Sequence, residues 1–148
     1  MGIKRTKEDA VFSDLVRERV GFICERCGHY EPEGVGRQAM HCSHFYSRGS
    51  GNRLRWNPLN GTCLCASCHR WLGEHPDDHT TFIKQKLGSD YELLANAKRM
   101  APLKMSKNEK QDMHEFYRGE LKRIRKLRRD GHTDRLDFRG WKYGESSC

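Results

Sequence analysis

The stretch that decides the fold is Cys65-Ala66-Ser67-Cys68-His69-Arg70-Trp71-Leu72, in which two cysteines separated by two residues lead into an amphipathic segment. A similar pair lies upstream, in Cys24-Glu25-Arg26-Cys27-Gly28. Each pair puts two thiolates on one tight turn, and two such turns complete a tetrahedral site of four sulfurs. The spacing therefore predicts a structural Zn²⁺ held by Cys24, Cys27, Cys65 and Cys68.

The other cysteines are Cys42, Cys63 and Cys148, which we interpret as core filling or free thiols. Cys63 competes with Cys65 as a ligand, but only Cys65 has the right spacing to Cys68. Seven cysteines, an odd number with paired spacing, favour metal binding over disulfides. A metal also suits a chain of 148 residues that is only 35% hydrophobic, because such a chain builds one modest core.

A formal net charge of +8 and a pI near 9.3 favour a polyanionic partner. Basic surfaces are also common in proteins that bind no nucleic acid, so charge alone does not decide the function. No apolar run approaches the roughly 18 residues that span a membrane, and residues 1–10 lack the apolar core of a signal peptide. We therefore expect no membrane association and a cytoplasmic location.

We predict one domain of the α+β class over residues 1–148, with four parts in order. A basic arm and an N-terminal helix occupy residues 1–21. Residues 22–76 form the zinc-stapled core, and residues 77–129 add C-terminal helices with a basic face. Residues 130–148, rich in glycine and charge, form an irregular tail.

Hydrophobic periodicity predicts the elements inside these parts. Residues 39–46 read as a strand, and residues 53–56 begin its hairpin partner after a turn-rich loop. A helix follows Cys68. Further helices are expected near residues 11–20, 78–87, 89–98 and 106–127. The last of these has an apolar stripe made by Met113, Phe116, Tyr117, Leu121, Ile124 and Leu127.

Four polar residues beside the cysteine pairs change the prediction from binding to catalysis. His41 and His44 lie on the predicted first strand, Asn60 precedes the second pair, and His69 follows its last cysteine. Phosphodiester cleavage needs a base that activates water and a cation that neutralises the developing phosphate charge. A neutral imidazole, whose ordinary pKa is about 6.5, can accept the proton of that water.

The order His44, Asn60, Cys65-x-x-Cys68-His69 resembles the HNH nuclease signature. More closely, the chain resembles the Rap (NinG) recombination family of lambdoid phages over about residues 10–127. The residues that carry this likeness are Phe12-Ser13, Val16-Arg17, Cys24-x-x-Cys27-Gly28, Ser43-His44-Phe45-Tyr46, Leu54-Arg55-Trp56-Asn57 with Asn60, Phe116-Tyr117 and Leu121-Lys122. The cysteine pairs and the histidine strand are more specific than the helices.

The resemblance implies a small ββα-metal (HNH) core with flanking helices. In it His44 is the general base, and Asn60 holds the hairpin loop and orients that imidazole. His69 ligates the catalytic divalent ion from the helix, with His41 as its partner from the strand. Related sequences tend to have an acidic residue near the place of His41 and asparagine at the place of His69. Imidazole ligands favour Zn, Mn, Co or Ni over Mg, so the ion stays open among Mg²⁺, Mn²⁺ and Zn²⁺.

Two further histidines follow the predicted helix. We interpret His75 and His79 as solvated loop residues, with a further metal ligand as the alternative.

The implied function is that of a metal-dependent endonuclease acting on branched recombination DNA, such as Holliday junctions and D-loops, alongside host or phage recombination proteins. Candidate DNA contacts are Arg48, Arg53, Arg55, Arg118, Lys122, Arg125, Lys126, Arg128 and Arg129. The alternatives are an HNH nuclease that cuts ordinary duplex DNA and a zinc-ribbon DNA-binding protein without chemistry. Symmetric cutting of a junction would favour a homodimer, although no heptad seam predicts one.

Overall fold

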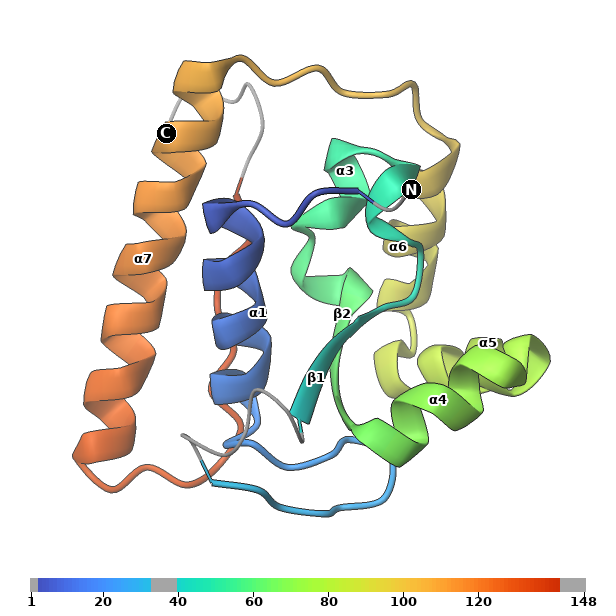
Figure 1. Ribbon diagram of the computed structural model, residues 1–148, viewed down its shortest axis with the longest axis vertical. Coiled ribbons are helices and arrows are strands. Elements are labelled where there is room, and N and C mark those ends of the chain that lie inside the picture. The colour runs from blue at the N-terminus through green and yellow to red at the C-terminus, as the bar shows by residue number, and fades with distance from the viewer. Residues whose placement is uncertain (1–2, 33–39, 142–148) are drawn as a thin grey trace.

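The computed structural model describes residues 3–32 and 40–141, and these residues form a mixed helical protein with a small two-stranded sheet (Figure 1). The elements in order are α1 (Lys7–Arg19), β1 (Met40–His44), η1 (Arg48–Ser50), α3 (Asn52–Arg55), η2 (Pro58–Asn60), β2 (Gly61–Cys65), α4 (Ala66–Glu74), α5 (Pro76–Leu87), α6 (Asp90–Arg99) and α7 (Lys107–Arg129). No helix in the described ranges is long and apolar enough to cross a membrane.

The helix α1 is confirmed, but it starts at Lys7, four residues before the predicted start near Val11, and it ends at Arg19. Thr6 caps it through a reciprocal pair of hydrogen bonds with Asp9, which satisfies amides that the first turn leaves open. Gly21 follows the helix with a φ of +64°, a conformation that side chains with a Cβ rarely adopt. Apolar and charged residues of α1 are both buried, because the helix lies between α7 and the sheet and contacts both.

The sheet consists of β1 and β2 in antiparallel register, with Met40 opposite Cys65 and His44 opposite Gly61. Gly61 allows β2 to start against α1, because a Cβ there would lie 2.7 Å from Val16 Cγ2. The predicted strand at residues 39–46 is confirmed over Met40–His44, while Ala39 lies outside the described residues.

The prediction that residues 53–56 begin the second strand is wrong. Asn52–Arg55 form the short helix α3, and the strand starts only at Gly61. The helical turn follows from Gly51, whose carbonyl accepts hydrogen bonds from the amides of Leu54 and Arg55. The alternation of charged and apolar residues there imitates a strand, but Leu54 and Trp56 are buried by a turn instead.

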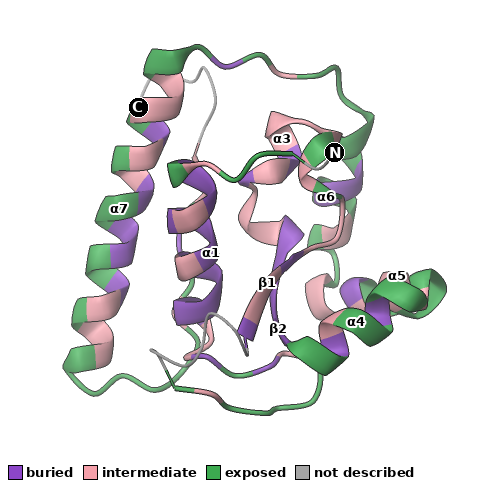
Figure 2. Cartoon of the chain, in the orientation of Figure 1, coloured by how far each residue is buried: buried purple, intermediate pink, exposed green. Residues whose placement is uncertain are grey.

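The long helix α7 packs along α1 on the side away from the sheet (Figure 1). Its buried residues, Met113, Tyr117, Leu121 and Ile124, face α1, and its exposed residues face outward (Figure 2). This confirms the predicted apolar stripe, in which Phe116 and Leu127 are half-buried members. The helices predicted at 78–87 and 89–98 correspond to α5 and α6.

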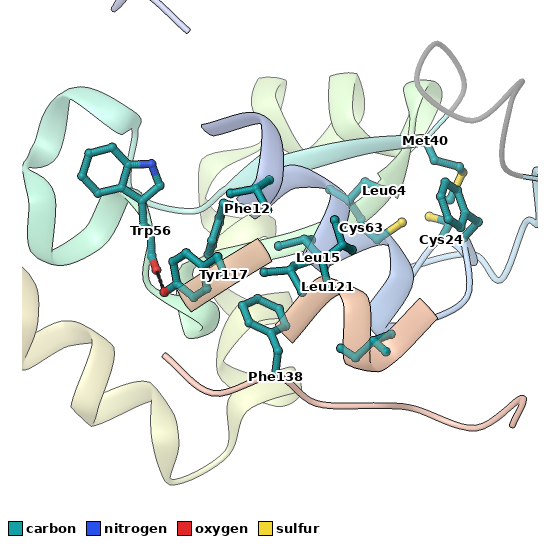
Figure 3. Packing of buried hydrophobic residues seen from close by; sticks show 14 of the residues in the cluster. Phe12, Leu15, Cys24, Met40, Trp56, Cys63, Leu64, Tyr117, Leu121 and Phe138 are labelled. Atoms are coloured by element: carbon teal, nitrogen blue, oxygen red, sulfur yellow. Dashed lines mark hydrogen bonds between the residues drawn. The ribbon is translucent and has the colours of Figure 1, made fainter. Parts of the chain in front are cut away.

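The core lies between α1, the sheet and α7. Phe12 and Leu15 of α1 meet Tyr117 and Leu121 of α7 there, with Phe138 from the tail (Figure 3). The Tyr117 hydroxyl donates to the Trp56 carbonyl at 2.6 Å. This bond joins α7 to the segment between the two strands, so the long helix stabilises the hairpin as well as α1.

The tail contains no helix or strand over residues 130–141, as predicted, but it is anchored to the domain. Phe138 is buried, and the Leu136 amide donates to the Arg19 carbonyl at 2.9 Å. The buried carboxylate of Glu120 accepts a hydrogen bond from the Arg139 amide. Thus the tail covers part of the core, where its residues share cavities with the C-terminal half of α5, rather than extending into solvent.

Candidate active site and metal centres

The four predicted zinc ligands come together. One ligand atom from each of Cys24, Cys27, Cys65 and Cys68 lies within 4.8 Å of all the others, and the sulfurs of Cys27 and Cys65 are 3.8 Å apart. Gly28, with a φ of +80°, turns the chain back so that its amide donates to the Cys24 carbonyl. A closed set of four sulfurs at this spacing can hold Zn²⁺ tetrahedrally.

Residues between the cysteines attach the first turn to the sheet. The Glu25 carboxylate accepts from the Cys63 amide at 2.7 Å, and the Glu25 amide donates to the Cys63 carbonyl at 2.8 Å. The Arg26 guanidinium donates to the Cys68 sulfur at 3.3 Å and lies over the Trp71 ring. The turn that carries Cys24 and Cys27 is therefore fixed to the segment that carries the other two ligands.

The thiols differ in acidity when no cation offsets their charges. Burial raises the pKa of Cys68 to about 12. Burial also opposes ionisation of Cys65, but hydrogen bonds led by the Ser67 hydroxyl lower the pKa of that thiol to about 6. Clustered sulfurs repel one another when several of them are negatively charged. The positive charge of a bound divalent ion offsets this repulsion, so the thiols that ligate it lose their protons. The donor set therefore fits Zn²⁺.

His41 of β1 and His69 of α4, 28 positions apart in the chain, meet beside this cluster. Their Nδ1 atoms are 2.9 Å apart, and their rings are nearly perpendicular. This contact is a hydrogen bond between the two rings. Two nitrogens that ligate a tetrahedral ion at about 2.1 Å lie about 3.4 Å apart, so the rings need to separate by about half an ångström to hold one ion together. Burial, and then the charge of His41, lowers the pKa of His69, which favours the neutral ring that a metal requires.

His44 lies three residues further along β1. Its Nε2 is 3.0 Å from the Arg55 carbonyl, a contact that requires a proton on Nε2 and leaves the Nδ1 lone pair available. Burial lowers the pKa of His44 below 6.5, so the ring is neutral at physiological pH. The Phe12 ring supports the imidazole at a centroid distance of 5.8 Å.

Asn60 is fully buried and holds the segment between the strands. Its Oδ1 accepts from the Tyr46 amide, and its Nδ2 donates to the carbonyls of Tyr46 and Leu54. The expectation that Asn60 holds the hairpin loop agrees with these bonds. The His44 ring is bonded to the Arg55 carbonyl, and Asn60 bonds the neighbouring Leu54 carbonyl, so any role of Asn60 in orienting that ring is indirect.

Asp9 is a residue of this region that the sequence did not reveal. Its carboxylate, 3% exposed as a residue, accepts hydrogen bonds from Arg55 Nε and Nη2 and from Trp56 Nε1. Burial opposes ionisation, but the Arg55 bond and the Thr6 amide outweigh it and lower the pKa of Asp9. The capping spacing from Thr6 to Asp9 was visible in the sequence, whereas the partner 46 positions away was not.

A cavity of about 370 Å³ opens at His44. It is lined by Arg5, Asp9, Ser13, Cys42, His44, Arg48 and His69. The cavity thus brings the predicted base and one predicted metal ligand to the same space, with two arginines beside them. Arg5 and Ser13 were not predicted; only the general basicity of the N-terminal arm signalled Arg5.

The three arginines between β1 and β2 all form hydrogen bonds or ion pairs within the protein. Arg55 is paired with the buried Asp9, so its guanidinium is engaged within the protein rather than free for the DNA contact that was predicted. Arg53 donates to the Ala101 carbonyl and so holds the linker before α7. Arg48 donates to the Ile3 carbonyl and lies 3.5 Å from Asp9, but its side chain stays 32% exposed at the cavity.

The basic residues of α7 fall into two groups, those bound within the protein and those exposed at its surface. Arg125 pairs with Glu18 at 3.2 Å, and Arg128 donates to four backbone carbonyls of the α1 end and the tail. These two positions are structural, contrary to the prediction of a free basic face. Lys126 pairs with Asp130 at the surface. Of the predicted α7 contacts, Arg118, Lys122 and Arg129 are exposed and line a shallow groove of about 450 Å³.

The remaining predicted residues have simpler positions. Cys63 is fully buried opposite Cys42 in the sheet, which fits core filling, and Cys148 lies outside the described residues. His75 bonds the Trp71 carbonyl through Nδ1 and stacks on the Trp71 ring. His79 is half-buried, not a solvated loop residue.

No protein-family model matches this chain, and no curated protein or solved structure shows significant similarity to it. What the chain does is therefore inferred from its own residues and their geometry.

Proposed function

We propose that the protein is a metal-dependent endonuclease of the HNH (ββα-metal) type that hydrolyses DNA phosphodiester bonds. The observation that supports this best is that His44 of β1 and His69 of α4 line one cavity, that His69 is bonded to His41, and that the four-cysteine cluster lies next to His69 in the chain. A zinc-ribbon DNA-binding protein has no need of histidines grouped at a polar cavity.

His44 is the general base in this proposal. The hydrogen bond to the Arg55 carbonyl fixes the ring and its tautomer, so Nδ1 is the atom that accepts a proton from water. Arg55 is in turn held by Asp9, and Asn60 holds the neighbouring Leu54 carbonyl. The base therefore rests on a backbone segment fixed at two points, which preorganises it.

His41 and His69 would hold the catalytic ion, which supplies positive charge for the phosphate and the leaving oxygen. The chain's own cations assist at the cavity. Arg48 and the exposed Arg5 line the same space as His44, where they can bind the non-bridging oxygens of a phosphate. Neither contact reads a base, which suits an enzyme that recognises the shape of its DNA.

Branched recombination DNA is the proposed substrate, on the strength of the resemblance to the Rap family. The groove of Arg118, Lys122 and Arg129 on α7 supports a second contact with the DNA backbone, separate from the cavity at His44, with which it shares no lining residue. A substrate with arms at an angle can reach both surfaces. A homodimer and recombination proteins as partners belong to the same proposal.

The test is a cleavage assay analysed by gel electrophoresis. Zinc-loaded protein is incubated with a four-way junction or with a linear duplex of equal length and sequence, with and without added Mn²⁺ or Mg²⁺. We expect metal-dependent cuts near the branch point. Equal cutting of both substrates would remove the branch preference and favour a duplex nuclease. Binding without cleavage under any divalent metal would favour the zinc-ribbon alternative.

A further inference from the structure

Three aromatic side chains form a cluster just beyond His44. Phe45 and Tyr46 directly follow His44 at the end of β1, and Tyr91 reaches them from α6. The ring centroid of Phe45 lies 4.8 Å from that of Tyr46 and 6.2 Å from that of Tyr91. All three residues are half-buried, so part of each remains accessible to solvent. We call Phe45, Tyr46 and Tyr91 the aromatic cluster.

Each tyrosine of the aromatic cluster has a lysine ammonium over its ring. Lys84 Nζ of α5 lies 5.4 Å from the ring centroid of Tyr91, and Lys98 Nζ of α6 lies 5.8 Å from that of Tyr46. Both lysines are exposed, and within the described residues neither forms a hydrogen bond or an ion pair. A cation–π contact at an exposed site is weak, so a ligand can displace each ammonium from its ring at small cost.

The backbone that carries the first two rings is fixed by Asn60. Its Oδ1 accepts a hydrogen bond from the Tyr46 amide, and its Nδ2 donates to the Tyr46 carbonyl. The Phe45 amide donates to the Asn60 carbonyl at 3.0 Å, and the Phe45 ring packs edge-on against His79. The rings are therefore held in place before a ligand binds, which lowers the entropic cost of binding.

The combination of rings and cations matches the chemistry of an unpaired nucleic acid strand. Proteins that bind single strands stack bases on aromatic side chains and attract the phosphates with basic residues. Of the other charges that act on Tyr46, Arg99 and Glu92 lie 4.0 Å apart and largely offset each other, so Lys84 and Lys98 leave an excess of positive charge. In a duplex, neighbouring bases cover the base faces. The cluster therefore suits unpaired bases, and the two lysines suit the phosphates beside them.

We propose that the aromatic cluster, together with Lys84 and Lys98, binds unpaired bases of the DNA substrate next to the cleaved bond. This inference rests on the proposed function and narrows its substrate class to DNA in which a single-stranded stretch meets a duplex. The duplex then lies at the cavity beside Arg48, two residues after Tyr46 in the chain. Because the same rings also pack α6 against the segment after β1, binding must be measured apart from stability.

The experiment measures affinity by fluorescence anisotropy on the full chain, loaded with zinc and without any other divalent metal. The probes are a labelled single-stranded oligonucleotide and a blunt duplex that contains the same sequence. Tyr91→Ala should weaken binding of the single strand roughly tenfold, because removal of an aromatic partner costs a stacked base about that much. Its affinity for the duplex should not change. Tyr91→Phe keeps the ring and should bind both probes like wild type.

Two further variants keep the test sharp. Tyr30→Ala is the matched control, because Tyr30 is 58% exposed in the loop after the first cysteine pair and lies outside the cluster. It should bind both probes normally. A variant with both Lys84→Gln and Lys98→Gln covers the case in which Tyr91→Ala melts early, since both changes lie at the surface. It should reduce the slope of log affinity against log salt for the single strand by about 1.4, about 0.7 for each lost phosphate contact.

The outcomes separate this inference from the proposed function. If the Tyr91→Ala and double lysine variants bind the single strand like wild type, the inference is wrong, whether or not the protein cuts DNA. An equal loss on both probes, or a wild type that does not bind the single strand, also overturns it and leaves the cluster to another partner. A loss confined to the single strand, in a protein that cuts no DNA, would support the aromatic cluster and contradict the nuclease.

Discussion

Two regions carry residues that were predicted to be functional: the corner formed by β1 and α4, and the outer face of α7. The predicted residues come together at the corner, whereas several of those on α7 are bound within the protein. At the corner, His41 and His69 approach within 2.9 Å although they are 28 positions apart. On α7, Arg125 and Arg128 turn inward to Glu18 and to backbone carbonyls. Cysteines and histidines at fixed spacing thus predicted which residues lie together better than the run of arginines and lysines on α7 predicted a free surface.

The reason is chemical. Cysteine pairs and histidines beside them have few structural uses in such a pattern, and their ligand geometry is set by local turns. Arginine has many uses, because a guanidinium that can bind phosphate can also bind a carboxylate or donate hydrogen bonds to carbonyls. Which use applies depends on whether an acceptor lies nearby in space, and neighbours in space are not visible in helical periodicity.

The largest effect is expected from Cys68→Ser, which removes one ligand of the four-sulfur cluster. Binding of a structural zinc contributes roughly 10 kcal/mol or more, comparable to the whole stability of a domain. We expect loss of the cooperative thermal transition, measured by circular dichroism, and loss of bound zinc by metal analysis. Cys63→Ser, a buried cysteine outside the cluster, is the control and should retain zinc. A zinc-free Cys68 variant with a wild-type melting curve would contradict the assignment.

A second substitution tests whether the C-terminal end of α7 stabilises the fold through Arg128. Arg128→Met removes donors to the carbonyls of Glu18, Arg19, His132 and Asp134, and we expect about 2 kcal/mol lower unfolding free energy. Arg129→Met, its exposed neighbour, should change stability by less than about 0.5 kcal/mol. Urea unfolding of both variants gives the comparison. Equal stabilities would mean that the Arg128 bonds contribute little.

The remaining α7 cations are expected to act on DNA. Changing Arg118, Lys122 and Arg129 together to Gln should reduce the slope of log affinity against log salt by about three, one unit for each lost phosphate contact. Cleavage at saturating DNA should persist. Lys107→Gln, at the far end of the same helix, is the matched control. An unchanged slope would mean that this groove does not touch the backbone.

The smallest effect concerns pH. A general base must be neutral, and burial holds the pKa of His44 below 6.5, so cleavage should decline only as pH falls through that lowered value. Arg48 and Arg55 also lower this pKa, and Asp9 raises it. Arg48→Gln should therefore move the acid limb upward, by less than about one pH unit because nearby solvent screens the charge. A limb above pH 7 in wild type would contradict this environment for His44.

Much of the fold was predictable from interactions between residues close in sequence, and the errors of the prediction also have causes close in sequence. The capping residues Thr6 and Ser106, Gly21 and the α7 stripe all act within a few positions, so their helices were predictable. The α3 turn was missed because alternating residues imitate a strand. Within the site, the cysteine cluster was predictable, whereas the Asp9 to Arg55 pair and the burial of His79 depend on packing between distant segments.

The central claim is that His44 catalyses phosphodiester cleavage at a metal-bearing corner, and a single-turnover assay of His44→Ala against wild type tests it most directly. Both proteins should carry zinc, melt alike and bind a four-way junction with similar affinity. With Mn²⁺ present, we predict that the variant cleaves roughly a hundredfold to ten-thousandfold more slowly. Cleavage by the variant at the wild-type rate would contradict the account.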